Sequence, residues 1–583
     1  MEKRILLFLL AVAVGIFGYS QNCNCDVTLT GLKSTSLNLI WASNISYSPG
    51  DTICIPAGSY AGFRFYDFEG TVHQPVTIIN CGGKVEITEN QYSGIAFKRS
   101  KYIHLTGTGA TSHQYGIYVK ETTSGGSVGV GLEEFSTNFE IDHIEIADTG
   151  FAGIMAKTDP KCSDPDTWRV NGFVLEDLNI HHNYIHDIGA EGIYIGYTGG
   201  YKVKSNRKCD GEYIFGHWLE DVDIHHNILE NIAWDGIQLN LVRENGVIRD
   251  NHITNYGTEN KYAQDFAMSI GGGIYAVYNN YMENGASGLA QGIQFISAES
   301  GTKVYNNVLV RPDFHGIFMH NRHEFDDSSE GYYVANNTII EPGDSGVFYN
   351  TVITQTEDPS KLYDTQESVP TFMVNNLVVD PGNDHASGNT WKGDQESYFD
   401  FNKKIERDSM LANIYTNIMT RQMDTLGLTD IANDDYSPLS ISSDLVELGS
   451  DLSGWGITFD FDNGARPSGT AFDIGAHEFQ IVGGTSFQAV IADDLELNDV
   501  LGQRDEKTTT LFYPNPARYS FRLENRGFNK NVLLQLMTMD GKVVYQGSYT
   551  MGEPFNVEEY SSGLYFLRII AAGKLETHRL VIR

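Results

Sequence analysis

Hydrophobic and polar positions alternate in short runs along most of the chain, and the pattern of runs repeats. Residues 178–196 (LNIHHNYIHDIGAEGIYIG) and 222–240 (VDIHHNILENIAWDGIQLN) show the unit clearly. Each has an alternating run, an asparagine, a second run, a turn, and a Gly-Ile step that opens a third run. Alternation with a period of two predicts β-strands. Three short strands per repeat predict one coil of a solenoid, in which each coil packs on its neighbours.

An asparagine occupies the same place in successive units. Two of these asparagines, at 227 and 251, are 251 − 227 = 24 residues apart, and loop insertions lengthen the other gaps. Stacked strands lie about 4.8 Å apart, so aligned asparagines can hydrogen-bond from coil to coil. We therefore expect an all-β, parallel β-helix with an asparagine ladder. The ladder positions are Asn183, Asn227, Asn251, Asn280, Asn307, Asn337 and Asn376.

On this coil repeat, residues 26–480 resemble the pectin-lyase-like superfamily of right-handed parallel β-helices. That superfamily includes polysaccharide lyases, glycoside hydrolases, epimerases and non-catalytic adhesins, so the resemblance implies a fold and not one reaction. We expect residues 26–98 to begin and cap the solenoid. The segments 437–449 (SPLSISSDLVELG) and 466–479 (RPSGTAFDIGAHEF) are expected to cap its last coil.

The first twenty residues have the pattern of a signal peptide, with a charged start, a short apolar stretch and small residues before Gln21. We therefore assign 1–20 to a signal peptide and 21–480 to the β-helix domain. Residues 481–510 form a polar, acidic linker. No other apolar stretch approaches the length that spans a bilayer, so we do not expect an integral membrane protein.

Residues 511–583 predict a small antiparallel β-sandwich, with alternating strands and an Asp-Gly turn. The sequences YPNPA (513–517), DGK (540–542), GLY (563–565) and LVIR (580–583) resemble the C-terminal sorting domain of the type IX secretion system of Bacteroidetes. The resemblance implies contact with that machinery, export across the outer membrane, and removal of the domain. The protein would then be released or attached to the cell surface. A carbohydrate-binding sandwich is the alternative, but this segment contains no tryptophan.

The net charge and the cysteines indicate which partners and which cellular compartment suit the protein. The net charge is −35, which excludes non-specific binding to nucleic acid. The six cysteines fit an oxidising compartment. We expect Cys162 and Cys209, in two long loops, to pair, because the other four cysteines lie together near the N-terminus; the connectivity of those four stays open. We expect a monomer.

Aligning the coils on the Gly-Ile step indicates which side chains share one outward face. The residues before the glycine include Glu191, Asp235 and His315, and Gly272 takes this place in the coil after Asp235. Polar groups that read hydroxyls and rings that stack on sugar faces predict a groove for an extended polysaccharide. The groove residues are Lys157, Tyr194, Trp234, Gln238, Asn240, Tyr275, Gln294, His320 and Arg322.

Glu191 and Asp235 are the candidate catalytic pair. They lie on neighbouring coils, and one stacking step of about 4.8 Å plus side-chain splay brackets the carboxyl separations of glycosidases. Two close carboxyl groups divide into an acid and a base. The leading hypothesis is a glycoside hydrolase in which His315 tunes or replaces one of the pair. These carboxylates could instead cap turns or bind Ca²⁺.

Two inserts, 157–176 and 197–219, follow the strands that carry Lys157 and Tyr194. The second holds Lys202, Lys204, Arg207 and Lys208 with no acid between them. Such a cluster could hold sulfate or carboxylate groups, which indicates an anionic polysaccharide, or it could be a solvated loop.

Two other functions stay open. In a polysaccharide lyase, Lys157 or His315 would be the base and the two carboxylates would bind Ca²⁺. The third possibility is a non-catalytic glycan-binding surface protein. The hydrolase requires no cofactor. His-His pairs at 181–182 and 225–226 adjoin the ladder on a different strand from the groove, and whether they bind a metal stays open.

Overall fold

A computed structural model divides the chain into two compact units, Met1–Ser486 and Phe487–Arg583. Each unit is described by itself. The predicted signal peptide and the linker lie outside the described residues. In the first unit the structure describes residues 23–88, 92–120, 122, 124–199, 207–285, 288–296, 298–320, 331–350, 352–353, 367–368, 371–382, 399–401 and 413–480. In the second it describes 511–513, 520–524, 531–538, 543–550, 554–557, 560, 563–571 and 574–582.

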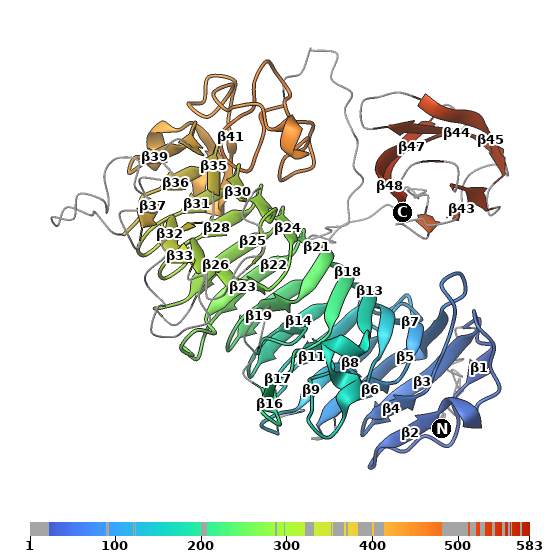
Figure 1. Cartoon of the computed structure of the whole chain (residues 1–583). Helices are drawn as coiled ribbons and strands as arrows, with labels where there is room; N and C mark the ends of the chain where they lie inside the picture. The colour runs from blue at the N-terminus through green and yellow to red at the C-terminus, as the bar shows by residue number, and fades with distance from the viewer. Residues whose placement is uncertain are drawn as a thin grey trace, which may run out of the picture. The chain divides into compact units, whose positions relative to one another are not determined.

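The first unit is a parallel β-helix built from two long parallel sheets (Figure 1). Each complete coil gives one strand to a 12-stranded sheet and two to a 23-stranded sheet, which confirms the three-strand repeat. The 12-stranded sheet contains β2 (Asn38–Trp41), β4 (Phe63–Tyr66), β6 (Ser93–Lys98), β9 (Val128–Glu133), β12 (Ile154–Ala156), β15 (Ile193–Ile195), β20 (Ile237–Asn240), β23 (Phe266–Gly271), β26 (Gln291–Ile296), β29 (Ile317–His320), β32 (Val347–Asn350) and β37 (Phe399–Phe401).

The 23-stranded sheet has two columns of strands that meet at the asparagine ladder. The first column holds β1 (Val27–Thr28), β3 (Thr52–Tyr60), β5 (Val76–Ile87), β7 (Lys101–Thr106), β10 (Thr137–Asp142), β13 (Val174–His181), β18 (Trp218–His225), β21 (Val242–Arg249), β24 (Tyr275–Tyr278), β27 (Lys303–Tyr305), β30 (Tyr332–Ala335), β35 (Thr371–Val374) and β38 (Ile414–Tyr415). The second column holds β8 (Ile117–Val119), β11 (Ile144–Ala147), β14 (Tyr184–Ile188), β19 (Ile228–Ile232), β22 (His252–Tyr256), β25 (Tyr281–Gly285), β28 (Val308–Val310), β31 (Thr338–Ile340), β36 (Leu377–Val379) and β39 (Ile418–Thr420).

The asparagine ladder forms one continuous line. The side-chain amide of Asn183 donates to Oδ1 of Asn227 at 3.0 Å, and Asn227 donates in the same way to Asn251. The line runs unbroken to Asn376 and continues to Asn417, one rung beyond the prediction. The residue before a ladder asparagine has a positive φ in many coils, which turns the chain from one strand column to the next. The ladder therefore satisfies the buried polar groups of each bend.

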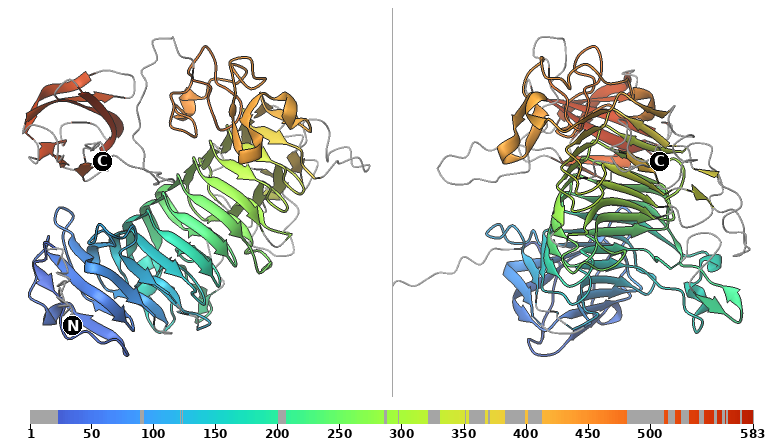
Figure 2. Two further views of the ribbon diagram at one scale, coloured as in Figure 1. Left: turned by 180° about the vertical axis from the view of Figure 1, so that it is seen from behind. Right: turned by 90° about the vertical axis from the view of Figure 1, so that its left-hand side faces the viewer.

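Aliphatic side chains stack inside the coils. Ile180, Ile224 and Ile248 are aligned on three successive coils and are fully buried. Each such side chain contributes about 1.5–3 kcal/mol when buried. The left-hand view of Figure 2 shows the strands of the unit stacked in steps along one axis. Side chains at the outward positions do not pack in this core and are available for binding or catalysis.

Three disulfides lie in this unit. Cys23 pairs with Cys81 and Cys25 with Cys54, which ties the N-terminal segment to β3 and β5. The third, between Cys162 and Cys209, confirms the predicted pair. It joins the two inserts, of which the second carries the short hairpin β16 (Lys208–Cys209) and β17 (Glu212–Tyr213).

The C-terminal closing segment differs from its predicted place. Leu428, Leu445 and Ile474 pack on the outward side chains of β28, β31 and β36. The amides of Asn306 and Asn336 donate to the carbonyl oxygens of Phe459 and Asp473. The segment thus covers the flank of the last coils, because their outward positions are apolar there. Its short elements are β40 (Leu428–Asp430), β41 (Asp435–Pro438), η6 (Met423–Thr425), η7 (Ile431–Asn433) and η8 (Ser453–Trp455).

The second unit is a small antiparallel sandwich, as predicted. One sheet holds β42 (Leu511–Tyr513), β43 (Ser520–Glu524) and β46 (Phe555–Asn556). The other holds β45 (Val543–Thr550), β44 (Asn531–Thr538), β47 (Gly563–Ala571) and β48 (Lys574–Ile582) in that order. One apolar core, including Phe521, Leu534 and Leu567, joins the two sheets.

The remaining described elements are short. They are η1 (Ala42–Asn44), η2 (Pro165–Thr167), η3 (Arg169–Asn171), β33 (Val352–Ile353) and β34 (Glu367–Ser368). Among the described residues, no helix is long and apolar enough to cross a membrane.

Candidate active site

The Gly-Ile step turns Glu191 and Asp235 away from the core. A Cβ on Gly192 would lie 2.6 Å from Leu229 Cδ2, so this position faces the interior and must be glycine. The side chain before it therefore faces outward. The backbone N–H of Gly192 donates to the carbonyl oxygen of Asp235 at 3.0 Å, which places the two acids on adjacent coils at the start of β15 and β20. The structure brings the predicted pair together as neighbours in the stack.

Both carboxyl groups are buried. Each is about 1% exposed, and burial raises the pKa of Glu191 to about 7 while Lys157 and Lys261 oppose the shift. Burial also raises the pKa of Asp235 well above its usual range, and the neighbouring carboxylates of Glu191 and Asp265 add to the effect. Both carboxyl groups therefore keep their protons to a higher pH than usual. Close carboxyl groups with shifted pKa values can act as an acid and a base.

A third carboxyl group, Asp265, lies beside the pair and was missed from the sequence; it is one residue before Phe266, which takes the register position of Asp235 on the next coil. It precedes β23 on the coil after Asp235, is 5% exposed, and burial raises its pKa to about 6. The prediction aligned this coil on Gly272. In the structure, Asp235 and Gly236 are instead aligned with Phe266 and Ala267 of the next coil. The sequence alignment missed this because the coil has alanine where the others have glycine. The alternating run FAMSIG was the available signal.

Each of the three carboxyl groups keeps one oxygen without a hydrogen bond. Glu191 Oε1 accepts from Gln264 Nε2 at 3.1 Å, and Asp235 Oδ1 accepts from the N–H of Phe266 at 3.0 Å. Among the described residues, their other oxygens are buried without a partner, as is Asp265 Oδ1. Gln238, Gln291 and Gln294 each have one such atom on the same sheet. Buried polar atoms in this state are typical of a surface that a polar ligand or water completes.

Aromatic rings and two lysines border the row. Trp234 is partly exposed, its Nε1 donates to Glu259, and Lys261 lies over its ring at 4.7 Å. The edge of Phe151 meets Trp234 at 6.0 Å. Lys157 lies 4.2 Å above the ring of Tyr194. The predicted mixture of rings and cations is therefore present.

The second insert begins against the groove. The hydroxyl of Thr198 lies 2.8 Å from that of Tyr194, 3.1 Å from Gln238 Nε2 and 3.3 Å from Asn240 Nδ2. The right-hand view of Figure 2 shows the β16–β17 hairpin projecting from the stack. The two inserts also meet where Arg169 lies 3.7 Å over the ring of Trp218, at the start of β18. The insert thus fixes Tyr194, Gln238 and Asn240 in place.

The structure does not bring His315 to the catalytic pair. Its coil is three steps beyond that of Asp235, roughly 14 Å along the stack. Its Nδ1 lies 2.8 Å from Ser345 Oγ, and its ring stacks on Phe348 at 4.6 Å. Gln294 lies between them, with Oε1 accepting from Ser269 Oγ. His315 is therefore a candidate subsite residue, too far away to replace either carboxyl group.

Tyr275 is wrongly placed by the sequence analysis. It begins β24 in the 23-stranded sheet, is 2% exposed, and its hydroxyl donates to the carbonyl oxygen of Gly271. Its aromatic ring belongs to the core. The error came from aligning this coil on Gly272. Tyr275 is three residues after Gly272, as Tyr194 is after Glu191 and Gln238 is after Asp235, so it was assigned to the groove.

The remaining predicted groove residues are only partly covered by the structure. His320 ends β29 in the 12-stranded sheet. Arg207 is exposed and hydrogen-bonds to Tyr197. Lys202, Lys204 and Arg322 lie outside the described residues.

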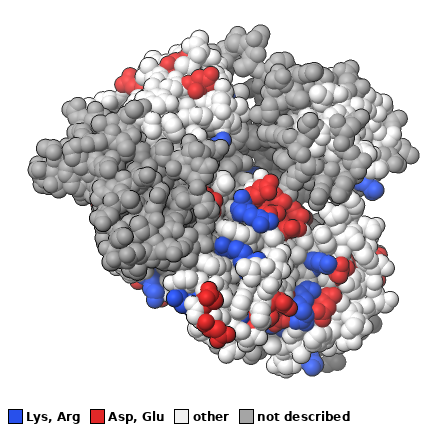
Figure 3. Space-filling model, in the orientation of Figure 1, with Lys and Arg blue, Asp and Glu red and all other residues white. Residues whose placement is uncertain are grey.

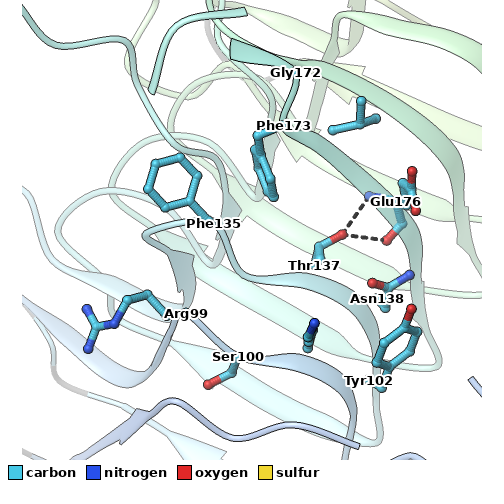
Figure 4. A pocket seen from close by; sticks show the side chains of 11 residues that line it. Arg99, Ser100, Tyr102, Phe135, Thr137, Asn138, Gly172, Phe173 and Glu176 are labelled. Carbon is cyan, nitrogen blue, oxygen red and sulfur yellow. Dashed lines mark hydrogen bonds between the residues drawn. The ribbon is translucent and has the colours of Figure 1, made fainter. Parts of the chain in front are cut away.

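A separate hollow of about 470 Å³ lies away from the carboxyl row, beside β7, β10 and β13 (Figure 4). The hydroxyl of Thr137 bridges to the backbone of Glu176 at its edge. Its cations are already paired, Arg99 with Asp67 and Lys101 with Glu69. On the face shown in Figure 3, the described basic and acidic groups likewise lie side by side. We assign no ligand to this hollow.

Within the described part of the chain, Glu191, Asp235 and Asp265 are not among the groups of three donors whose ligand atoms all lie within 4.8 Å of one another.

The β-helix is similar in fold to solved enzyme structures. One is the GH136 lacto-N-biosidase from Eubacterium ramulus (11% identity, 64% of this chain, 62% of that chain, TM-score 0.41). Another is the catalytic domain of a GH87 alpha-1,3-glucanase (11%, 68%, 62%, 0.28). A third is the A-module of a mannuronan C-5 epimerase from Azotobacter vinelandii (12%, 57%, 79%, 0.20). The alignment thus spans 62% of the length of the first two. No curated protein sequence matches the chain.

The C-terminal unit has a family match. Residues 511–583 match the model of the secretion system C-terminal sorting domain. This agrees with the sandwich of β42–β48 and with the motifs noted in the sequence. The protein therefore carries the sorting domain of the type IX secretion system and is exported to the cell surface or beyond.

Proposed function

We propose that this protein is a secreted glycoside hydrolase that cleaves a polysaccharide lying along the 12-stranded sheet. The observation that carries the proposal is a group of three buried carboxyl groups on three successive coils, each with an oxygen that has no hydrogen-bond partner among the described residues. Glycosidases use two carboxyl groups on either side of the scissile bond, one as acid and one as base or nucleophile. The export of the protein fits a polymeric substrate outside the cell.

The electrostatics support a division of roles between the carboxyl groups. Asp235 is the central carboxyl group, and Glu191 and Asp265 on both sides favour its protonated form. It is therefore the proton donor to the leaving oxygen. Glu191 feels the positive charges of Lys157 and Lys261, which favour its carboxylate, so it is the base or nucleophile. Asp265 would hold a hydroxyl or the attacking water.

We further propose that the substrate is an anionic glycan. Lys157 and Lys261 flank the carboxyl row, and Arg207 is exposed on the second insert. Cations in this arrangement suit sulfate or carboxylate substituents. No cofactor is required for hydrolysis of this kind, and we propose none.

The lyase alternative has less support. A lysine base must lose its proton near neutral pH. Burial lowers the pKa of Lys157, but Tyr194 and Asp159 more than offset this effect and the pKa is raised overall. Its Nζ lies 3.3 Å from Asp159 Oδ1. Lys157 is therefore suited to hold an anion and not to remove a proton.

The test is turnover on charged and neutral algal and plant polysaccharides, read by reducing-end release. Asp235→Asn and Glu191→Gln should each lower the rate by about 10²- to 10⁴-fold and leave glycan binding largely intact. Glu230→Gln, in β19 on the other sheet, is the matched control and should keep full activity. Full activity in both groove variants would disprove the site. Products with a new, ultraviolet-absorbing double bond would identify a lyase, and binding without turnover would favour a glycan-binding protein.

A further inference from the structure

A second group of ionisable side chains lies on the outer face of the 23-stranded sheet, away from the carboxyl row. His104 is in β7, Glu140 and Asp142 are in β10, and His181 is in β13. Glu140 is in register with His104, and Asp142 is in register with His181. Three successive coils therefore bring two imidazoles and two carboxylates together.

Their ligand atoms converge. His104 Nε2 lies 2.5 Å from Asp142 Oδ2, and His181 Nε2 lies 3.0 Å from Glu140 Oε1. His181 Nε2 is also 4.0 Å from Asp142 Oδ2. One donor atom each from His104, Glu140 and Asp142 lie within 4.8 Å of one another. The side chain of Glu140 is 43% exposed, so the cluster is open to solvent.

Two of these groups, Asp142 and His181, are anchored through their far-side atoms. Asp142 Oδ1 accepts from Thr106 Oγ1 at 2.5 Å and lies 2.6 Å from His143 Nδ1. His181 Nδ1 lies 2.8 Å from His182 Nδ1, and the ring of His181 stacks on that of His225 at 4.8 Å. Metal-binding imidazoles and carboxylates are held in this way, with the second atom fixed by an outer partner.

An orphaned polar atom adjoins the cluster. Asn179 is the register partner of Glu140 on the next coil. Its Oδ1 is buried and, among the described residues, has no hydrogen-bond partner. This is an independent sign that a water or ion completes the surface beside Glu140.

We propose that His104, Glu140, Asp142 and His181 form a binding site for a divalent transition metal, of which zinc is the best fit. Two imidazoles with two carboxylates select zinc over calcium or magnesium, which prefer oxygen ligands alone. Zinc binds such donors at about 2.0–2.2 Å. Binding would require the contact between His104 Nε2 and Asp142 Oδ2 to open, because the two atoms lie 2.5 Å apart. The ion would link three coils and would be separate from the carboxyl row.

The test is titration of the untagged full chain with zinc after dialysis against a chelator, followed by calorimetry and by the thermal midpoint. We expect one zinc per chain and a higher midpoint. His104→Asn and Glu140→Gln should weaken binding by more than about tenfold, and Thr106→Val, which removes only the anchor of Asp142, by about 10- to 100-fold. His252→Asn, an exposed histidine of β22 outside the cluster, is the matched control and should bind as the wild type does.

Two results would overturn the site. One is the absence of saturable zinc binding to the wild type at micromolar concentrations. The other is equal binding by the wild type, His104→Asn and Glu140→Gln, which would place the metal elsewhere. Calcium added in place of zinc should shift the thermal midpoints of the wild type and of His104→Asn by the same amount. A calcium-induced shift that occurs in the wild type but not in His104→Asn would contradict the choice of zinc.

Discussion

Replacing one rung of the asparagine ladder tests how the β-helix is held together. Asn251 is 2% exposed and lies at the centre of the ladder. Its Nδ2 donates to Ile224 O at 2.8 Å and to Asn280 Oδ1 at 3.0 Å, and its Oδ1 accepts from the backbone N–H of Asn227 at 3.0 Å. Its Nδ2 also donates to Arg249 O, and its Oδ1 also accepts from Asn227 Nδ2, both at 3.0 Å. Asn251→Ala removes all five bonds and leaves the N–H of Asn227 buried without its partner.

The expected cost follows from these contacts. An orphaned buried donor costs about 1–3 kcal/mol, and each net hydrogen bond lost costs about 0.5–1.5 kcal/mol. With one orphaned donor and four further bonds lost, the sum is about 3–9 kcal/mol of unfolding free energy. Asn255→Gly is the matched control, because Asn255 makes one partly exposed bond to Asn231 and its φ of +51° suits glycine. That change should cost less than about 1 kcal/mol.

Urea unfolding followed by circular dichroism measures both variants. Equal m-values justify comparison of the midpoints, while a lower m-value in Asn251→Ala would indicate that the coils unfold in parts. If Asn251→Ala is no less stable than Asn255→Gly, the ladder does not hold the bends and the argument fails.

Three further outcomes are expected. In the folded protein Glu191 has a pKa of about 7, whereas in the unfolded chain its pKa is near 4.5, so the free energy of unfolding falls as the pH rises between these values. Glu191→Gln should therefore be more stable than the wild type at pH 8, by up to about 3 kcal/mol, and equally stable at pH 4. Thermal melts at the two pH values measure this difference. Replacing Cys162 and Cys209 by serine should leave the circular dichroism of the β-helix unchanged but speed proteolysis within the two inserts, and unchanged cleavage would contradict their role as a tie. Intact mass of protein from the native medium should show the loss of residues 1–20 and of most or all of 511–583; a complete C-terminus would argue against processing.

The repeat made the fold predictable. The asparagines, the Gly-Ile steps and the alternating strands are local signals that recur, so the prediction of the ladder did not depend on any one coil. The coil of β23 shows the limit. It has Ala267 where other coils have glycine, and alignment on Gly272 moved Tyr275 into the groove and hid Asp265.

Only those site residues that occupy a repeated position of the coil could be predicted from the sequence. Glu191 and Asp235 stand directly before the repeated glycine, so their shared face followed from the sequence. Gln264 and Lys261 come from a loop that the repeat does not describe, and only the folded chain places them beside Glu191. The cluster around His104 joins coils whose loops differ in length, so no fixed spacing in the sequence indicated it.

The spacing of the coils has a consequence for how such a site tolerates change. The distance between carboxyl groups on adjacent coils is fixed mainly by backbone hydrogen bonds such as that from Gly192 to Asp235. That length hardly depends on which aliphatic residues fill the interior. The interior can therefore diverge widely in sequence while the reacting groups keep their separation. Insertion of one whole coil between Glu191 and Asp235, in contrast, would increase that separation by a full step of about 4.8 Å and end the reaction at once.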